Sequence, residues 1–211
     1  DPLDGANQVG SFAGTNGDAQ NPTDFGANDI ADGSSGTVFM RLNIDSFAGS
    51  NFSFGLSDTT SGFDANFGDF RSQLVISSSG FRVRDGGGSV TFDQTLSEDT
   101  WYDLWIVADN ATDTSQVYIQ GGAFSSQTQL TTGSGATNSW AFRSSAGDLG
   151  TFLIRSGSTH SDTVLLDDIY VDSSAVNLAN PIPEPSTTYA LILGATFLLV
   201  ITRLRSNRKK A

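Results

Sequence analysis

Few side chains in the first 180 residues could carry acid–base chemistry. Glycoside hydrolysis commonly uses two carboxylic acids that flank the scissile bond, and this part of the chain holds a single glutamate, Glu98. Asp103 lies between Trp101 and Trp105 in a strand-like stretch, with no obvious carboxylate partner. The pattern predicts a protein that is not an enzyme, with an enzyme acting on extracellular polysaccharide as the alternative.

The single histidine, His160, lies in the sequence SGSTHSD at 156–162. These residue types could compose a Ser-His-Asp triad, but adjacent loop residues seldom reach triad geometry, and no nucleophile elbow is present. We expect an exposed loop histidine without a catalytic role. Zinc is not expected either, because a zinc site needs three or four ligands and the chain has no cysteine.

Loop carboxylates make calcium the most plausible ion, because Ca²⁺ prefers carboxylate, amide and backbone oxygens. The candidate ligands are Asp109, Asn110 and Asp113 in one turn, and Asp167 with Asp168 in the last strand-like stretch. Successive strand residues point to opposite faces, so one of Asp167 and Asp168 should face inward. A buried carboxylate needs an ion or backbone N–H donors, and hydrogen bonding to a loop is the alternative to calcium.

Aromatic side chains in a polar region are candidates for glycan contact. Trp140 and Phe142 lie in the stretch 121–149, which is rich in Ser, Thr and Gly. Aromatic rings give sugars a flat apolar platform, and neighbouring polar groups supply hydrogen bonds. For Trp101 and Trp105, which share one face of a strand, packing in the core is the favoured interpretation.

Apolar and polar residues alternate along most of the chain before residue 180, which is typical of strands. The pattern predicts about nine or ten of them, and the clearest occupy 38–45, 52–56, 74–76, 81–84, 90–92, 101–108, 117–119, 152–154 and 164–171. No connection resembles a crossover helix, so pairing should be antiparallel. We expect an all-β fold, an antiparallel β-sandwich of the jelly-roll type. The long stretch 121–149 should be functional or mobile, and part of it could be a strand.

The C-terminal end has a different composition. Pro183, Glu184 and Pro185 precede the uncharged stretch 186–202, and five basic residues follow. As a helix this stretch would cover about 25 Å, slightly less than a bilayer core of about 30 Å. The basic end should remain in the cytoplasm and the preceding residues outside. A buried core helix is the alternative, but the basic residues could not follow it into a core.

Charge separates the same two parts. Residues 1–180 hold 22 acidic residues and 6 arginines, a net charge of −16, whereas residues 181–211 carry +4. A domain with this much negative charge should repel nucleic acid and anionic polymers. The organisation we expect is a β-sandwich over 1–176, a linker over 177–187, a transmembrane helix over 188–202 and a cytoplasmic tail over 203–211. An exported body also requires an export signal, and since the chain starts at Asp1 we expect that signal to have been removed or left out.

The order Pro183-Glu184-Pro185, apolar span, basic end resembles the PEP-CTERM sorting signal of Gram-negative bacteria. The resemblance covers about 30 residues and implies recognition by an exosortase in the membrane, cleavage near the motif, and release or transfer to the cell surface. Proteins with this signal are typical of bacteria that make exopolysaccharide and biofilm matrix.

A second resemblance concerns the body. The stretch TWYDLWIVAD at 100–109, a polar turn and QVYIQG at 116–121 resemble the central hairpin of laminin-G-like and concanavalin-like jelly rolls. LLDDIYV at 165–171 resembles the closing strand of the same families. These folds include lectins, hydrolases and spacers, so the likeness implies a fold and no particular activity.

Together these features predict an exported cell-surface or matrix protein with a non-catalytic sandwich for adhesion, matrix structure or glycan binding. The expected partners are an exosortase, the membrane and extracellular polysaccharide. Self-assembly into a surface array or fibre through exposed strand edges is a further alternative.

Overall fold

The computed structural model describes residues 10–13, 19–60, 67–157 and 159–182. The chain divides into two units, Asp1–Ala179 and Asn180–Ala211, and all the described strands belong to the first. The predicted sorting motif Pro183-Glu184-Pro185, the helix over 188–202 and the basic tail lie outside the described residues. Within the described ranges, no helix has the length and apolar character needed to cross a bilayer.

Thirteen strands and one short 3-10 helix, η1 (Phe67–Asp69), make up the described part of the fold. The strands are β1 (Gly10–Ala13), β2 (Ala19–Asp24), β3 (Ser35–Ile44), β4 (Asn51–Ser57), β5 (Ser72–Ser77), β6 (Gly80–Asp85), β7 (Gly88–Thr91), β8 (Trp101–Asp109), β9 (Thr114–Gly121), β10 (Phe124–Gln129), β11 (Trp140–Ala141), β12 (Thr151–Ser156) and β13 (Thr163–Asp172).

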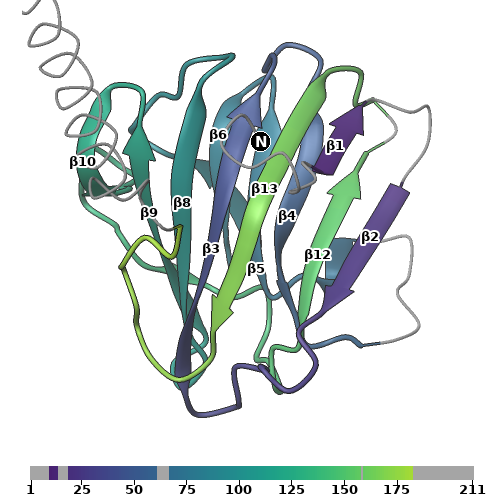
Figure 1. Ribbon diagram of the computed structural model, residues 1–211, viewed down its shortest axis with the longest axis vertical. Coiled ribbons are helices and arrows are strands. Elements are labelled where there is room, and N and C mark those ends of the chain that lie inside the picture. Colours follow the sequence, from purple (N-terminus) through teal and green to yellow (C-terminus); the bar gives the residue numbers. More distant parts are fainter. Residues whose placement is uncertain (1–9, 14–18, 61–66, 158, 183–211) are drawn as a thin grey trace, which may run out of the picture. The chain divides into compact units, whose positions relative to one another are not determined.

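The strands form two stacked sheets (Figure 1). Sheet A has the order β1-β13-β3-β8-β9-β10, with β11 pairing to β9 beside this path. Sheet B has the order β2-β12-β4-β5-β6-β7. The ladders between these strands are antiparallel, which confirms the predicted all-β antiparallel sandwich.

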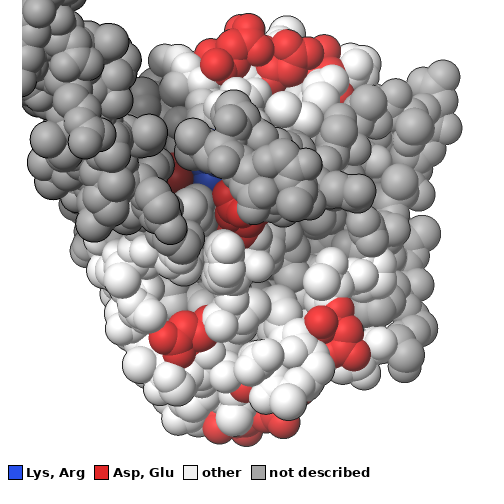
Figure 2. Space-filling view, in the orientation of Figure 1, with Lys and Arg blue, Asp and Glu red and all other residues white. Residues whose placement is uncertain are grey.

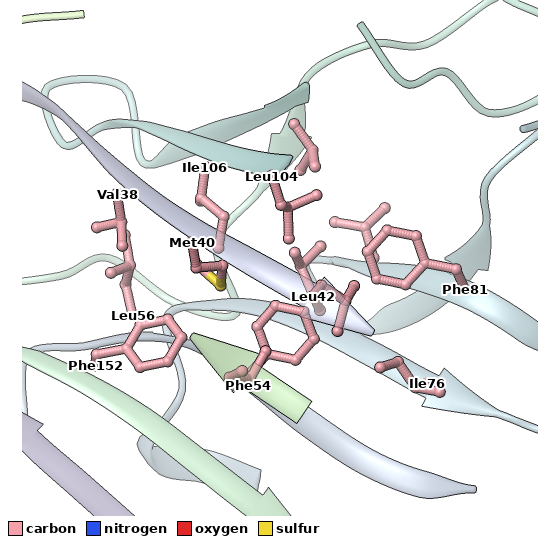
Figure 3. Packing of buried hydrophobic residues seen from close by; sticks show 14 of the residues in the cluster. Val38, Met40, Leu42, Phe54, Leu56, Ile76, Phe81, Leu104, Ile106 and Phe152 are labelled. Carbon is pink, nitrogen blue, oxygen red and sulfur yellow. The ribbon is translucent and has the colours of Figure 1, made fainter. Parts of the chain in front are cut away.

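Strand β3 lies at the centre of sheet A, between β13 and β8. Its alternation sends Val38, Met40 and Leu42 into the space between the sheets, where they are fully buried. Figure 3 shows them packed against Leu104 and Ile106 of β8, with Phe54, Phe152 and others from sheet B on the opposite side. Burial of this apolar surface is the main force that holds the two sheets together, since the chain has no disulfide.

The stretch 121–149 contains two of the four strands that the alternation pattern did not identify. One is β10, which pairs with β9 across a register shift, and the other is the short β11. Strands β1 and β2 were missed as well. Because β10 is polar and β2 contains Pro22, neither shows the apolar alternation of a half-buried strand.

After β13, residues 173–179 return across the outer face of sheet A, and we call this segment the strap. It crosses in front of β8 and β9 in Figure 1. The backbone N–H of Asn177 donates to Thr37 Oγ1 at 2.9 Å, and Gln127 Nε2 donates to the carbonyl of Leu178 at 2.9 Å. Contacts with the sandwich therefore continue to Ala179, three residues beyond the expected boundary at 176.

Candidate functional site

The turn after β8 contains the three residues Asp109, Asn110 and Asp113 that were predicted to bind calcium. Asp109 Oδ1 accepts the N–H of Ala111 at 3.1 Å, and Asp113 Oδ1 accepts the N–H of Ala146 at 3.0 Å. Asn110 is buried, and its side-chain amide donates to the carbonyls of Ile30 and Gly147. These contacts tie neighbouring loops together, while the buried Oδ1 of Asn110 accepts no hydrogen bond from the described residues. Calcium binding by Asp109, Asn110 and Asp113 stays a prediction.

Burial contradicts the glycan contacts predicted at Trp140 and Phe142. Trp140 is fully buried, its Nε1 donates to Thr132 Oγ1 at 3.1 Å, and its ring meets that of Phe92 edge to face at 5.1 Å. Phe142 is buried in the same core cluster. Neither ring can offer a face to a sugar. The polar composition of 121–149 concealed two inward-facing aromatic residues.

Asp167 and Asp168 lie at a β-bulge, where the register between β13 and β3 shifts between Asp167 and Tyr170. Asp168 has φ +50°, a left-handed conformation that is uncommon for residues other than glycine. The bulge lets both carboxylates approach the outer face of sheet A, contrary to the expectation that one would point into the core. Asp167 is nevertheless only 3% exposed, and its Oδ1 accepts the N–H of Asp168 at 2.9 Å.

Arg41 joins these carboxylates to a third. In the ladders Asp167 lies opposite Arg41, and Arg41 lies opposite Asp103, so the three form one row across β13, β3 and β8. Arg41 Nη1 is 3.7 Å from Asp168 Oδ2, and Arg41 Nε is 3.8 Å from Asp103 Oδ1. The guanidinium also lies over the ring of Trp101, 4.9 Å from its centroid.

The environment of Asp103 favours its protonated form. Burial raises the pKa of the Asp103 carboxyl, the positive charge of Arg41 opposes that shift, and the negative charge of Asp168 adds to it. The pKa of Asp103 is thus shifted in the direction that a proton-donating carboxyl group requires. Figure 2 views this side of the molecule; among the charged residues that it colours, red acidic groups form several patches and blue basic atoms are visible in one small area.

Aromatic rings continue the same outer face. Phe39 packs edge to face on Trp105 with centroids 5.1 Å apart, and Tyr170 lies 6.2 Å from Phe39. Trp105 is buried, in agreement with the favoured interpretation, whereas Trp101 is only partly buried. Neither ring belongs to the cluster between the two sheets. Tyr170 is 44% exposed and forms the accessible end of this row.

The large apolar side chains that are exposed in the described residues all lie near this place. They are Ile169 and Tyr170 at the bulge and Val176 in the strap. Exposed apolar groups rimmed by polar ones often mark a binding surface. We call the set of Arg41, Asp103, Asp167, Asp168, Ile169 and Tyr170 the bulge site.

The histidine loop differs from its prediction in burial. His160 is 2% exposed, against the expectation of an exposed residue, and its Nδ1 accepts the N–H of Asn51 at 3.2 Å. Asp162 Oδ2 accepts the N–H of Gly49, and Ser161 Oγ donates to the carbonyl of Gly49. These side chains tie the loop to the start of β4.

The described residues contain no group of three or more His, Asp or Glu side chains placed to hold a metal ion. At the bulge site the guanidinium of Arg41 occupies the position between Asp103 and Asp168, where a cation would otherwise be attracted. The donor set there suits a cluster of fixed charges better than calcium.

No protein-family model and no curated protein sequence matches the chain. Among solved structures, a sialidase matches with a TM-score of 0.54 and 13% identity, over 81% of this chain and 16% of the sialidase chain. A heptameric SAP-like pentraxin from Limulus polyphemus matches with a TM-score of 0.43 and 15% identity, over 80% of this chain and 76% of that one. Lectin I-B4 from Griffonia simplicifolia matches with a TM-score of 0.45 and 10% identity, over 74% of this chain and 80% of the lectin chain.

At these identities the similarity concerns the fold alone, and this chain spans only about a sixth of the sialidase it matches. The shared fold is a β-sandwich of two antiparallel sheets, which the chain has in common with the matched part of the sialidase.

Proposed function

We propose that this chain is an exported protein of a Gram-negative bacterium that an exosortase sorts to the cell surface or the extracellular matrix. The observation that carries the proposal is the order of segments after the sandwich: the strap ends at Ala179, and Pro183-Glu184-Pro185, an apolar stretch and a basic end follow. In this proposal the segment 188–202 holds the protein in the membrane until it is processed.

We further propose that the sandwich is non-catalytic and binds extracellular glycan at the bulge site. The exposed ring of Tyr170 would supply the apolar platform, and the nearby charged side chains would supply hydrogen bonds. This assignment replaces the buried Trp140 and Phe142 as the aromatic contact.

The sorting proposal is tested in the source bacterium with the full chain and a tag in the exposed turn at 26–28. Replacing Pro183, Glu184 and Pro185 by alanine should leave an unprocessed, membrane-retained protein, as deletion of the exosortase should. A tagged body that resists external protease while the basic end is digested would reverse the topology and overturn the proposal.

The glycan proposal is tested on a glycan array with and without calcium. Tyr170→Ala should weaken binding about 3- to 10-fold, because an aromatic contact contributes about 0.5–1.5 kcal/mol beyond its buried area. Tyr118→Ala, a partly buried tyrosine on β9, is the matched control. Equal losses in the two variants, or no binding in either arm, would contradict the assignment and leave a structural role in the matrix.

A polysaccharide-active enzyme is the second candidate, and the raised pKa of Asp103 beside Asp168 favours it. One carboxyl would act as the acid and the other as the base or nucleophile. Turnover of matrix polysaccharide that Asp103→Asn abolishes would support this candidate. Turnover that Asp103→Asn leaves unchanged, or none at all, would exclude Asp103 as a catalytic acid.

A further inference from the structure

The arginines of the acidic body are distributed unequally between the two sheets. Residues 1–180 hold six arginines. Arg41 belongs to sheet A, and the other five belong to sheet B or to loops bonded to it: Arg71, Arg82, Arg84, Arg143 and Arg155. On strand β6, Val83 enters the core, so its neighbours Arg82 and Arg84 point outward from sheet B.

Backbone hydrogen bonds bring three of these residues together from distant parts of the chain. The N–H of Arg143 donates to the carbonyl of Arg71 at 2.9 Å. Two residues earlier, Ala141 accepts the N–H of Gly86 at 3.0 Å and donates its own N–H to Asp85 Oδ1 at 3.0 Å. The segment 141–143 therefore runs between Arg71 and the β6–β7 hairpin that carries Arg84, and we call Arg71, Arg84 and Arg143 the arginine cluster.

The positive charge of the arginine cluster is only partly neutralised. Arg71 Nη2 pairs with Asp58 Oδ1 at 2.8 Å, and Asp58 Oδ2 also accepts the N–H of Gly147. Arg143 Nη2 donates to the neutral Gln73 Oε1 at 3.0 Å. In the described part of the chain, Asp58 is the only carboxylate that forms an ion pair with any of the three guanidiniums.

Arg84 likewise has neutral partners. Its Nε and Nη2 donate to the carbonyls of Gly86 and Gly87 at 2.9 and 2.8 Å. Burial lowers the pKa of Arg143, and the positive charges of Arg84 and Arg71 lower it further, so Arg143 lies close enough to both to be repelled by them.

The side chains of the cluster are held in place before any ligand arrives. Gln73 is 3% exposed, and its Nε2 donates to Ser53 Oγ at 3.0 Å while its Oε1 holds Arg143. The Nε atoms of Arg71 and Arg143 are buried and have no hydrogen-bond acceptor among the described residues, and the same holds for the Nε of Arg82 outside the cluster. An anion would therefore have to bind at the Nη groups of the cluster.

We propose that the arginine cluster binds the carboxylate groups of an acidic polysaccharide, one that contains uronic acid residues. A carboxylate fits the planar fork of a guanidinium with two parallel hydrogen bonds. The cluster concentrates positive charge in a body whose net charge is −16, so an acidic polymer would be attracted to this face and repelled elsewhere. The choice of a polysaccharide as the ligand rests on the proposed glycan-binding function. The assignment of an anion site does not, because it follows from the contacts of the three arginines.

Binding is measured by titration calorimetry of the full chain in a neutral detergent with oligogalacturonate and with a neutral oligoglucan. Oligogalacturonate should bind, and about sixfold more salt should weaken it severalfold. Arg143→Gln and Arg84→Gln should each weaken binding at least 10-fold. Arg82→Gln is the matched control: it removes the same charge from the same strand, and Arg82 donates to the carbonyl of Ser89 outside the cluster. It should change binding less than threefold.

Several results would overturn the proposal. Equal losses in Arg82→Gln and Arg84→Gln would show attraction by net charge alone, and tighter binding of a sulfated oligosaccharide would reject the carboxylate. If Arg143→Gln does not fold, Arg143→Lys keeps the charge without the fork, and unchanged affinity in that variant would reject fork recognition. Tyr170→Ala should leave oligogalacturonate binding intact. If Tyr170→Ala loses affinity for oligogalacturonate, the carboxylates bind at the bulge site and not at the arginine cluster. Failure of neutral glycans to bind would contradict the proposed glycan site but not the anion site.

Discussion

Trp105 Nε1 donates a 3.2 Å hydrogen bond to the carbonyl oxygen of Ala179, at the end of the strap. Trp105 lies in the middle of β8, so the chain leaves the sandwich over the centre of sheet A and not at the end of its last strand. Only three residues separate Ala179 from Pro183. The proposed cleavage motif therefore begins close in sequence to a point that is fixed on the folded domain.

Replacing Trp105 by phenylalanine should release the strap. Phenylalanine keeps an aromatic ring at this position but has no N–H group, so the hydrogen bond is lost at a cost of about 1 kcal/mol. We expect thermolysin to cut faster around Leu178, measured by mass spectrometry of the products. Trp140→Phe is the matched control, because it removes the bond to Thr132 inside the core. Unchanged cleavage in Trp105→Phe, or equal acceleration in both variants, would show that this bond does not hold the strap.

Gly55→Ala should destabilise the sandwich strongly. Gly55 has φ +154° in the middle of β4, and a Cβ added there would lie 2.0 Å from the carbonyl oxygen of Ser72 on β5. Relief requires the two strands to separate, at an expected cost of about 3 kcal/mol in the free energy of unfolding. Gly147→Ala, where the Cβ meets open space, should cost less than about 0.5 kcal/mol. Equal midpoints in urea for the two variants would contradict this.

The sequence predicted the central strands well because the inward positions of strands such as β3 and β8 are apolar. Period-two patterning therefore located both strands and their inward residues, although much of their outer face is buried as well. Edge strand β10 and the two-residue β11 bury too little for a pattern. Trp140 was misassigned for the same reason, since its neighbours are polar while its ring is buried in the core.

The candidate sites depended on contacts that sequence spacing does not contain. Asp167 and Asp168 were identified, but the bulge that turns both toward Arg41 depends on a backbone conformation at Asp168 that no local signal indicated. The position of Tyr170 on the outer face depends on the same bulge, because the register of β13 against β3 shifts just before it. The arginine cluster joins residues up to 72 positions apart, through hydrogen bonds of the segment 141–143.

Asp93 should contribute stability that acid removes. The backbone N–H groups of Gly135 and Ser134, helped by the hydroxyl of Thr131, hold the pKa of Asp93 below its ordinary value of 3.8. A lowered pKa in the folded state gives stability that is present above pH 3.8 and lost as the pH falls through the lowered value. Asp93→Asn should therefore be less stable than the wild type at pH 6, and the difference should shrink toward pH 2.

Urea denaturation at several pH values measures that difference. Asp45→Asn, at an exposed side chain, controls for the change of net charge. A difference between the wild type and Asp93→Asn that stays constant from pH 6 to pH 2 would show that the carboxylate charge of Asp93 does not hold the 131–135 loop.

Asp103 should have the opposite dependence on pH. Burial and the negative charge of Asp168 raise its pKa above 3.8 despite the attraction of Arg41, so the folded state binds a proton more tightly than the unfolded state does. The folded state then loses stability as the pH rises from 3.8 through the raised pKa. Asp103→Asn removes this titration. Its stability relative to the wild type should therefore rise between pH 3.8 and the raised pKa of Asp103, and should stay constant at higher pH. Urea midpoints at half-unit pH steps follow the two proteins. If the wild type instead gains on the variant as the pH rises, the attraction of Arg41 outweighs burial, and Asp103 is held as a carboxylate that could not donate a proton.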